Sequence, residues 1–316
     1  MFGKKKSNLN PQGVALGELL IALQATTIKA SMDGDTLVAQ HEHYKVCVEV
    51  IPPSTRESKN GPIKAVVRVI SELPKPFLQL FAGKEAGATA TFNSFAAMGS
   101  INVDHGKVSI GSRLTIYEAE NAWSSLHLPL LMFTVIGGTQ GILGGIRRVI
   151  SNEDTAEGES EWTLNDFEGV EKFLSRVCVC TVSESGLTAE FGLSKGAASA
   201  VAGHHDTALF QMMADQPHPE LGGGLFCLLQ MPHQISNQEK LQEICLQLNN
   251  MEMAECDSPP HFGAWCEGRL GGNPAYVSFL PNALYSVNGI ALNASIWALH
   301  RAQWANRVLA SMGVDS

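Results

Sequence analysis

Apolar and polar residues alternate in several short runs along the first half of the chain. We predict three strands at Asp35–Gln40, Tyr44–Ile51 and Ile63–Ile70, and the last two alternate clearly. The last two flank the segment PPSTRESKNGP, whose Pro and Asn-Gly residues predict a hairpin loop. Further along, INVDHGKVSIGSRLTIY predicts two more short strands.

Apolar residues at helical spacing bracket these strands. Gly13–Ile28 carries four leucines on one helical face, and a helical stretch lies within Phe77–Met98. Asn121–Ile146 contains no Asp, Glu, Lys or Arg and predicts a long apolar helix. The order in the first half is therefore helix, three strands, helix, two strands, helix.

The second half repeats this order. Asp166–Arg176 predicts a helix capped by Asp166, and Asn237–Asn250 predicts another. The predicted strands are VCVCTV, LTAEFGLS, TALFQMMA, GGLFCLLQMP, FGAWCEG and AYVSFL, followed by an alanine-rich helix within Tyr276–Gly313. The landmark pairs, 160 to 167 positions apart, are His41 and His204, Val66 and Phe226, Asn121 and Asn288. This spacing favours a tandem duplication over two unrelated α+β domains.

We therefore predict an α+β protein, a tandem repeat of a helix–three strands–helix–two strands–helix unit. Each unit is an antiparallel sheet with helices packed on it. The stretch SNEDTAEGES at residues 151–160 is acidic and rich in small residues, which predicts a linker. It separates a first α+β domain (residues 1–150) from a second (residues 161–316).

Both predicted closing helices carry small residues four positions apart, which lie on one helical face. These residues are Gly137, Gly141 and Gly145 in the first and Ala294, Ala298 and Ala302 in the second. We expect the two helices to pack closely where the halves meet, with Trp297 and Trp304 in the core or on a partner surface. The alternative is that the paired glycines end a shorter helix.

Charge and cysteine content narrow the function classes. The 316 residues include 22 Lys and Arg against 31 Asp and Glu, and only Lys4–Lys6 form a basic run. The excess of negative charge and the shortness of this run argue against nucleic acid as a partner. The seven scattered cysteines favour free thiols in a reducing cytoplasm. Cys178 and Cys180 share a strand face but lack the second pair that a zinc site needs. No apolar signal segment follows Lys6, and five glycines within Asn121–Ile146 favour a buried helix over a membrane span.

Two histidine clusters precede the predicted hairpins at corresponding places. His41-Glu42-His43 and His204-His205-Asp206 offer imidazole and carboxylate ligands for a transition metal. The alternative is that these histidines are solvated residues at the edges of loops. A metal-binding protein or metal-dependent hydrolase that uses His41, His43, His204 and His205 is therefore an alternative function. The sequence contains no nucleotide-binding loop and no nucleophile motif, so we assign no catalytic or cofactor-binding residues and expect no cofactor.

The element order resembles the type III secretion chaperone-like fold, which also occurs in the bacterial YbjN-like family. The resemblance covers Val14–Ile150 and Leu164–Met312, once per half. It rests on the hairpin pairs YKVCVEVI/IKAVVRVI and TALFQMMA/GGLFCLLQ and on the pieces SRLTIYEAENAW and LPNALYSVNGIALN. Secretion chaperones are small homodimers that bind an effector segment, so the resemblance implies a protein partner and transfers no site residues.

We accordingly expect a non-enzymatic, cytoplasmic protein-binding or chaperone-like module built as a covalent pseudo-dimer. It would hold a peptide or a partner protein on a sheet edge or in an apolar groove. The oligomeric state stays open.

Overall fold

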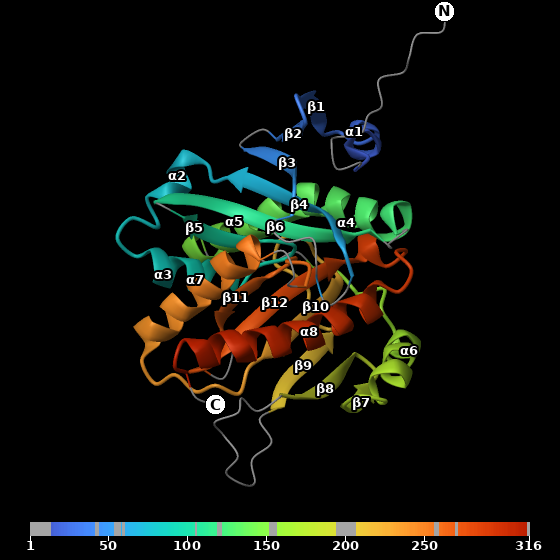
Figure 1. Cartoon of the computed structure of the whole chain (residues 1–316), viewed down its shortest axis with the longest axis vertical. Coiled ribbons are helices and arrows are strands. Elements are labelled where there is room, and N and C mark those ends of the chain that lie inside the picture. Colours follow the sequence, from blue (N-terminus) through green and yellow to red (C-terminus); the bar gives the residue numbers. More distant parts are fainter. Residues whose placement is uncertain are drawn as a thin grey trace, which may run out of the picture.

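The computed structural model consists of two six-stranded antiparallel sheets with helices around them (Figure 1). It describes residues 14–41, 44–53, 58, 61–104, 106–118, 122–151, 157–193, 207–255, 259–268 and 271–314. In Figure 1 the sheet of the first half lies above the sheet of the second half, and the long helix α8 crosses the front of the second sheet.

The first sheet is built from the N-terminal half of the chain. Its strands are β1 (Lys29–Asp33), β2 (Thr36–Gln40), β3 (Lys45–Ile51), β4 (Ile63–Glu72), β5 (Ser100–Asp104) and β6 (Lys107–Tyr117). The accompanying helices are α1 (Leu16–Gln24), α2 (Lys75–Leu78) and α3 (Glu85–Asn93). A long helical segment follows as η1 (Trp123–His127), α4 (Leu128–Phe133), η2 (Thr134–Gly138) and α5 (Thr139–Ser151).

The second sheet is built from the C-terminal half. Its strands are β7 (Val179–Ser183), β8 (Gly186–Gly192), β9 (Thr207–Met213), β10 (Gly224–Gln230), β11 (Ala264–Glu267) and β12 (Pro274–Pro281). Its helices are α6 (Leu164–Leu174), α7 (Gln238–Ala254), the short η3 (Asn282–Leu284) and α8 (Ile290–Ser311).

The two sheets have the same strand order. The first runs β1-β2-β3-β4-β6-β5 and the second, read in the same direction, runs β7-β8-β9-β10-β12-β11. All the paired strands are antiparallel. The predicted α+β class with antiparallel sheets is therefore confirmed.

The number of strands in the first half corrects the prediction, because four strands rather than three precede its middle helices. The additional strand β1 has the sequence KASMD, and most of its side chains are exposed. It pairs with β2 through a tight turn at Gly34, whose φ of 61° suits glycine. An edge strand exposed on both faces has no apolar alternation to reveal it.

The start of α6 also differs in detail from the prediction. Thr163, not Asp166, is the N-cap residue. Asp166 lies three residues later, and its carboxylate accepts a hydrogen bond from the Thr163 backbone N–H at 2.8 Å. The two residues form a capping box, which satisfies backbone donors that the first helical turn leaves free.

The glycine pairs do not end the closing helix of the first half. Helical structure continues through Gly137 and Gly145 to Ser151, with π-helical turns at η1 and η2. The alternative of a shorter helix that ends at the glycine pairs is therefore wrong. Each glycine inside a helix costs about 1 kcal/mol relative to alanine, so close packing must compensate for this cost.

One apolar core runs through both halves. It extends from Val14 and Leu19 in the first half to Ala302 and Leu309 in α8, and it includes core-facing residues of both sheets. Helix α8 packs on α6 and on strands β9 and β10, while α1 packs on α4 and on its own strands β1 and β2. The halves therefore share buried apolar surface.

The middle helices pack on strands of both halves. Helix α7 packs on β11 and β12 of its own sheet and on β5 and β6 of the first, and α3 packs on β5 of its own sheet and on β11 of the second. The two helices also pack on each other. Two backbone contacts lie at the same junction: Arg113 forms a bridge with His261, and the Phe279 N–H donates to the Ala97 carbonyl at 3.0 Å.

Candidate functional site

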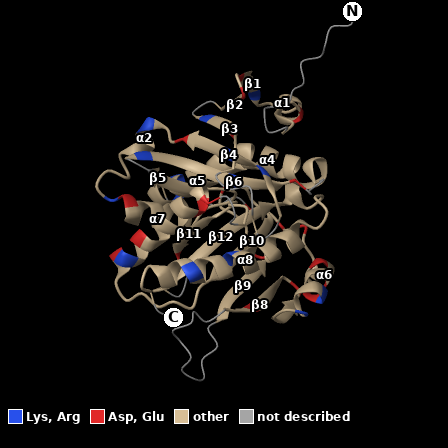
Figure 2. Ribbon diagram, in the orientation of Figure 1, with Lys and Arg blue, Asp and Glu red and all other residues tan. Residues whose placement is uncertain are grey.

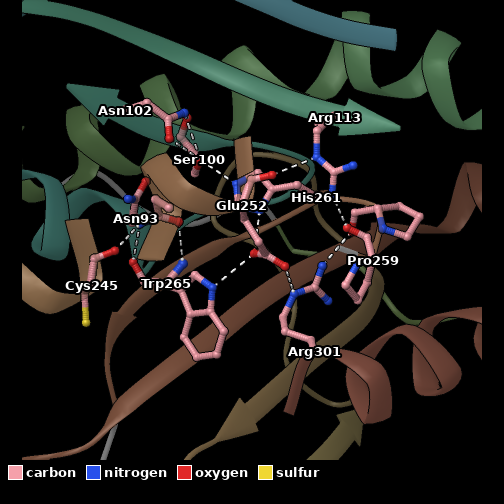
Figure 3. A network of polar contacts seen from close by, with 12 residues as sticks. Asn93, Ser100, Asn102, Arg113, Cys245, Glu252, Pro259, His261, Trp265 and Arg301 are labelled. Atoms are coloured by element: carbon pink, nitrogen blue, oxygen red, sulfur yellow. Dashed lines mark hydrogen bonds and ion pairs between the residues drawn. The ribbon is translucent and has the colours of Figure 1, made fainter. Parts of the chain in front are cut away.

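A buried polar cluster lies where the two halves meet (Figure 3). Glu252 comes from α7, His261 from the segment before β11, and Arg301 from α8. Ser100 of β5 and Arg113 of β6 join them from the first half. None of these five residues is more than 3% exposed. Charged groups are rarely buried this deeply unless they are paired, so the cluster is the first candidate for a site.

The Glu252 carboxylate is the centre of the cluster, and both of its oxygens accept hydrogen bonds. Oε1 accepts from Arg301 Nε at 2.7 Å, while Oε2 accepts from His261 Nδ1 at 2.8 Å and from Trp265 Nε1 at 3.0 Å. The Arg301 guanidinium also lies 3.7 Å from the centre of the Tyr276 ring. The carboxylate thus meets donors on both oxygens, which compensates for much of the cost of its burial.

Arg113 ties the first sheet to this cluster through backbone carbonyls of the second half. Its Nε donates to the Glu252 carbonyl at 2.7 Å and its Nη2 to the Pro259 carbonyl at 2.6 Å. Its Nη1 donates to Thr115 Oγ1 at 2.6 Å. Because the side chain leaves a strand of one half and ends in the other, it fixes the two halves relative to each other.

Ser100, His261 and Glu252 form a chain with the order of a hydrolytic triad. Ser100 Oγ lies 2.7 Å from His261 Nε2, and the opposite ring nitrogen lies 2.8 Å from the carboxylate. Nucleophile, base and acid stand in this order in serine hydrolases. However, all three residues are fully buried at 0% exposure, so a substrate carbonyl has no access to the serine. We therefore interpret the chain as a structural hydrogen-bond network.

The protonation states fit this interpretation. Burial alone would raise the pKa of Glu252, but the positive charge of Arg301, with His261 and Arg113, outweighs burial and holds that pKa below its usual value. Burial lowers the pKa of His261, although the Glu252 carboxylate opposes the shift. A neutral His261 then donates from Nδ1 to Glu252 and accepts from the Ser100 hydroxyl at Nε2.

The histidine clusters are only partly visible in the structure. His43, His204 and His205 lie outside the described residues. The ring of His41 stacks on Tyr44 with the ring centres 4.3 Å apart. Burial lowers the pKa of His41, although a hydrogen bond to the Val135 backbone opposes this shift. Among the residues that the structure describes, no group of three or more His, Cys, Asp or Glu side chains could hold a metal ion.

The glycines of the first closing helix allow a close approach by other segments. A Cβ placed on Gly141 would lie 3.0 Å from Ala97 Cβ and 3.4 Å from the His218 ring, and one on Gly137 would lie 3.8 Å from Leu221. His218 and Leu221 belong to the β9–β10 connection, so Gly137 and Gly141 face the second half, whereas Gly145 faces Phe95 of the first. Helix α8 is not among the neighbours of these glycines, and the predicted contact between the two closing helices stays a prediction.

We predict that Gly145→Ala lowers the stability of the protein. A Cβ at Gly145 would overlap the Phe95 side chain. Overpacking of this kind costs about 1–3 kcal/mol, more than the roughly 1 kcal/mol that alanine adds in helix propensity. Urea denaturation measures the change. The matched control is Gly169→Ala in α6, where no atom lies within 4 Å and the variant should be slightly more stable. Equal stability changes in the two variants would contradict the packing role of Gly145.

The alanine stripe of α8 faces the interior of the second half. Ala302 is 0% and Ala298 4% exposed, whereas Ala294 is half-buried. Trp304 is buried, and the ring of Trp297 lies 6.1 Å from that of Phe262. Both tryptophans pack with the core, as in the first alternative, and do not form an exposed partner surface.

The described surface has at least three grooves, and two of them lie beside α6 and at the junction of the halves. One of about 560 Å³ lies between α6 and the start of α8 and is lined by residues that include Trp162, Asp166 and Tyr285. The other, of about 230 Å³, lies at the junction of the halves beside Phe95, His218 and Phe226. Neither groove is lined by a residue of the Ser100–His261–Glu252 chain.

Strand β7 differs from the other outer strands by its exposed apolar side chains. It is one of the two edge strands of the second sheet, with β11 at the other edge, and carries no charge in its sequence VCTVS. Val179 is 66% exposed, Val177 just before the strand 63%, and Phe173 at the end of α6 44%. The equivalent edge strand β1 carries Lys29 and Asp33 instead. Charged residues protect sheet edges from pairing with other chains, so β7 is the less protected of the two edges. Figure 2 marks the positions of Lys and Arg in blue and of Asp and Glu in red along the ribbon.

The comparisons with known proteins do not assign the chain to a family. No protein-family model matches it, and no curated protein matches it. Among solved structures, the di-domain ARO/CYC StfQ from the steffimycin biosynthetic pathway is similar at 10% identity over 93% of this chain and 95% of that one, with a TM-score of 0.15. A TM-score this low supports no inference about fold or function.

One helix of the described part is long and apolar enough to cross a membrane. It is the segment Trp123–Ser151, and 56% of its apolar stretch is buried inside the fold.

Proposed function

We propose that the protein is a non-enzymatic binding module, built as a covalent pseudo-dimer, that takes up an extended peptide segment of a partner protein at strand β7. The observation that carries this proposal is that the edge strand β7 has no charged residue and exposes apolar side chains. Val179 is exposed within the strand, and Val177 is exposed just before it. Strand addition at a free sheet edge obtains affinity from main-chain hydrogen bonds and specificity from alternate side chains. A chaperone-like role and a cytoplasmic location are part of the same proposal.

Reciprocal contacts support the pseudo-dimer. Ala97 of the first half bonds to Phe279 of the second, and His261 of the second half bonds to Arg113 of the first. Positions 97 and 261 are 164 residues apart and positions 113 and 279 are 166 apart, within the range of offsets in the sequence. In a two-fold interface, each contact between residues i and j recurs with the roles exchanged. Helices α3 and α7 follow the same rule, because each packs on a strand of the opposite half.

The main chain of β7 is positioned to accept a further strand. A two-residue turn joins β7 to β8, so Ser183 and Gly186 form the hydrogen-bonded pair next to the turn. In an antiparallel pair such residues alternate with ones whose N–H and C=O groups point away from the partner. The groups of Val182 and Cys180 therefore point to the open edge, where an extended peptide can bond to them.

Peptide binding by edge variants tests the proposal. A library of extended peptides with alternating apolar residues is selected against the whole protein, and affinities are measured by fluorescence polarisation. Val182→Pro removes a donor on the open edge and should weaken the selected peptides at least about tenfold, because proline cannot pair there. Met32→Pro removes the equivalent donor of β1 and is the matched control, which should leave affinity unchanged.

A second variant keeps the test independent of the proline. Val179→Lys changes a 66% exposed side chain, which should alter stability by no more than about 0.5 kcal/mol, yet it adds a charge at the docking edge. It should also weaken binding. Peptides that bind all variants as they bind the parent protein, or a selection that enriches none, would contradict strand addition at β7.

A further inference from the structure

Two thiols lie in contact at the start of β7. Cys178 Sγ and Cys180 Sγ are 3.4 Å apart, and both side chains are half-buried. The Cys178 thiol also donates to the Leu174 carbonyl at 3.3 Å, and its backbone N–H donates to the same carbonyl at 2.9 Å. The end of α6 therefore holds Cys178 so that its sulfur faces Cys180. This pairing is independent of any peptide binding at the strand.

The backbone there can accommodate a covalent bond between the sulfurs. Residues two apart in a strand have Cα atoms about 6.6–6.8 Å apart, at the upper end of the roughly 4.4–6.8 Å seen in disulfides. Cys178, however, precedes β7, which begins at Val179, and lies in the bend that follows α6. The two sulfurs already lie 3.4 Å apart, so both side chains are turned toward each other. No described strand pairs with the opposite edge of β7, so a small adjustment breaks no described pairing on that side.

We propose that Cys178 and Cys180 form a reversible disulfide by exchange with a small-molecule disulfide RSSR. The Cys178 thiolate attacks one sulfur of RSSR, which forms a mixed disulfide and releases RS⁻. The Cys180 thiolate then attacks Cys178 Sγ, forms the Cys178–Cys180 bond and releases the second RS⁻. Two electrons pass from the cysteine pair to RSSR, and the two protons that the cysteines lose are taken up by the two released thiolates.

The order of attack follows from the surroundings of the two sulfurs. Burial raises the pKa of the Cys178 thiol, but a hydrogen bond from Cys180 opposes the shift. Burial and the neighbouring Cys178 raise the pKa of Cys180 to about 12. Cys178 therefore ionises first and is the attacking thiol, and Cys180 resolves the mixed disulfide. A disulfide closed over so short a span is strained, which makes it readily reduced, as in regulatory rather than structural disulfides.

Mass spectrometry of the full-length protein tests the proposal. The protein is equilibrated in buffers of oxidised and reduced glutathione, quenched in acid, alkylated with iodoacetamide and digested with trypsin. Cleavage after Arg176 and Lys195 gives one peptide, residues 177–195, that contains Cys178 and Cys180 and no other cysteine. As the share of oxidised glutathione increases, this peptide should convert to the disulfide form. That form carries no alkyl group and is two hydrogens lighter than the unalkylated peptide with two free thiols. A peptide that stays doubly alkylated in excess oxidised glutathione would overturn the proposal.

Single variants test the roles of the two sulfurs. Cys180→Ser should accumulate one glutathione on Cys178, because the resolving thiol is absent. Cys178→Ser should gain glutathione on Cys180 more slowly, because burial, the larger cause, still raises the pKa of the remaining thiol. Oxidation of the parent protein should accelerate about tenfold per pH unit near neutrality, since the attacking thiol titrates above that range. Equal rates for the two variants would overturn the assignment of Cys178 as the attacking thiol.

Discussion

Replacing Glu252 by glutamine should lower the free energy of unfolding by about 3–5 kcal/mol, the range observed when one partner of a buried ion pair is removed. The two carboxylate oxygens accept from Arg301, His261 and Trp265, so all three neighbours present N–H groups. A glutamine must direct its own NH₂ group at one of these donors, whichever way the amide is turned. It also leaves the buried Arg301 without its counter-charge.

Urea denaturation of the Glu252→Gln variant, followed by tryptophan fluorescence, measures this change. Glu243→Gln on the exposed side of the same helix is the matched control and should alter stability by no more than about 0.5 kcal/mol. A Glu252→Gln variant as stable as this control would show that the buried cluster does not hold the two halves together.

Acid should destabilise the protein through buried His127, which is 2% exposed in η1. Burial lowers its pKa from 6.5 to about 4 in the folded protein. Below pH 6.5 the unfolded chain therefore binds a proton that the native state rejects until about pH 4, and stability falls as the pH falls through this window. At about 1.4 kcal/mol per pKa unit, the full loss is about 3 kcal/mol, of which about 2 kcal/mol is lost by pH 5.

The variant His127→Leu isolates this contribution. Urea denaturation at about pH 7.5 and about pH 5 gives the pH dependence of stability for each protein. The dependence should be smaller in the variant by about 2 kcal/mol, whatever the absolute stability of the leucine at that site. The same pH dependence in both proteins would contradict a neutral, buried His127 in the native state.

The strands with one buried face could be predicted from the sequence because their side chains alternate. The hairpin β3–β4 lies where the alternation indicates, and the hairpin β9–β10 lies where two apolar runs flank the loop DQPHPELGG. Strand β1 could not be predicted in this way, since its two faces are both largely exposed. The contacts of α3 and α7 with the opposite half were equally inaccessible, because periodicity identifies a helix but not the sheets that it covers.

The buried cluster was missed because its members are far apart in the sequence. Ser100 and His261 are separated by 161 positions, and no local motif relates them. A weaker signal was present: Arg113 is the one charged residue between Val108 and Tyr117, and Arg301 follows the run IWALH in α8, which contains no Asp, Glu, Lys or Arg. A single charge within an otherwise uncharged segment of the core indicates buried polar partners, although it does not identify them.

Hydrogen exchange of the β7 amides tests the account most directly, because it reads the open edge one residue at a time. In the free protein, the N–H groups of Cys180 and Val182 should exchange rapidly, while those of Val179 and Thr181, which face β8, are protected. Addition of a selected peptide should slow the exchange of Cys180 and Val182 at least about tenfold and leave the other two unchanged. Peptide binding that leaves Cys180 and Val182 unprotected, or that protects the groove beside α8 instead, would contradict strand addition as the function of this protein.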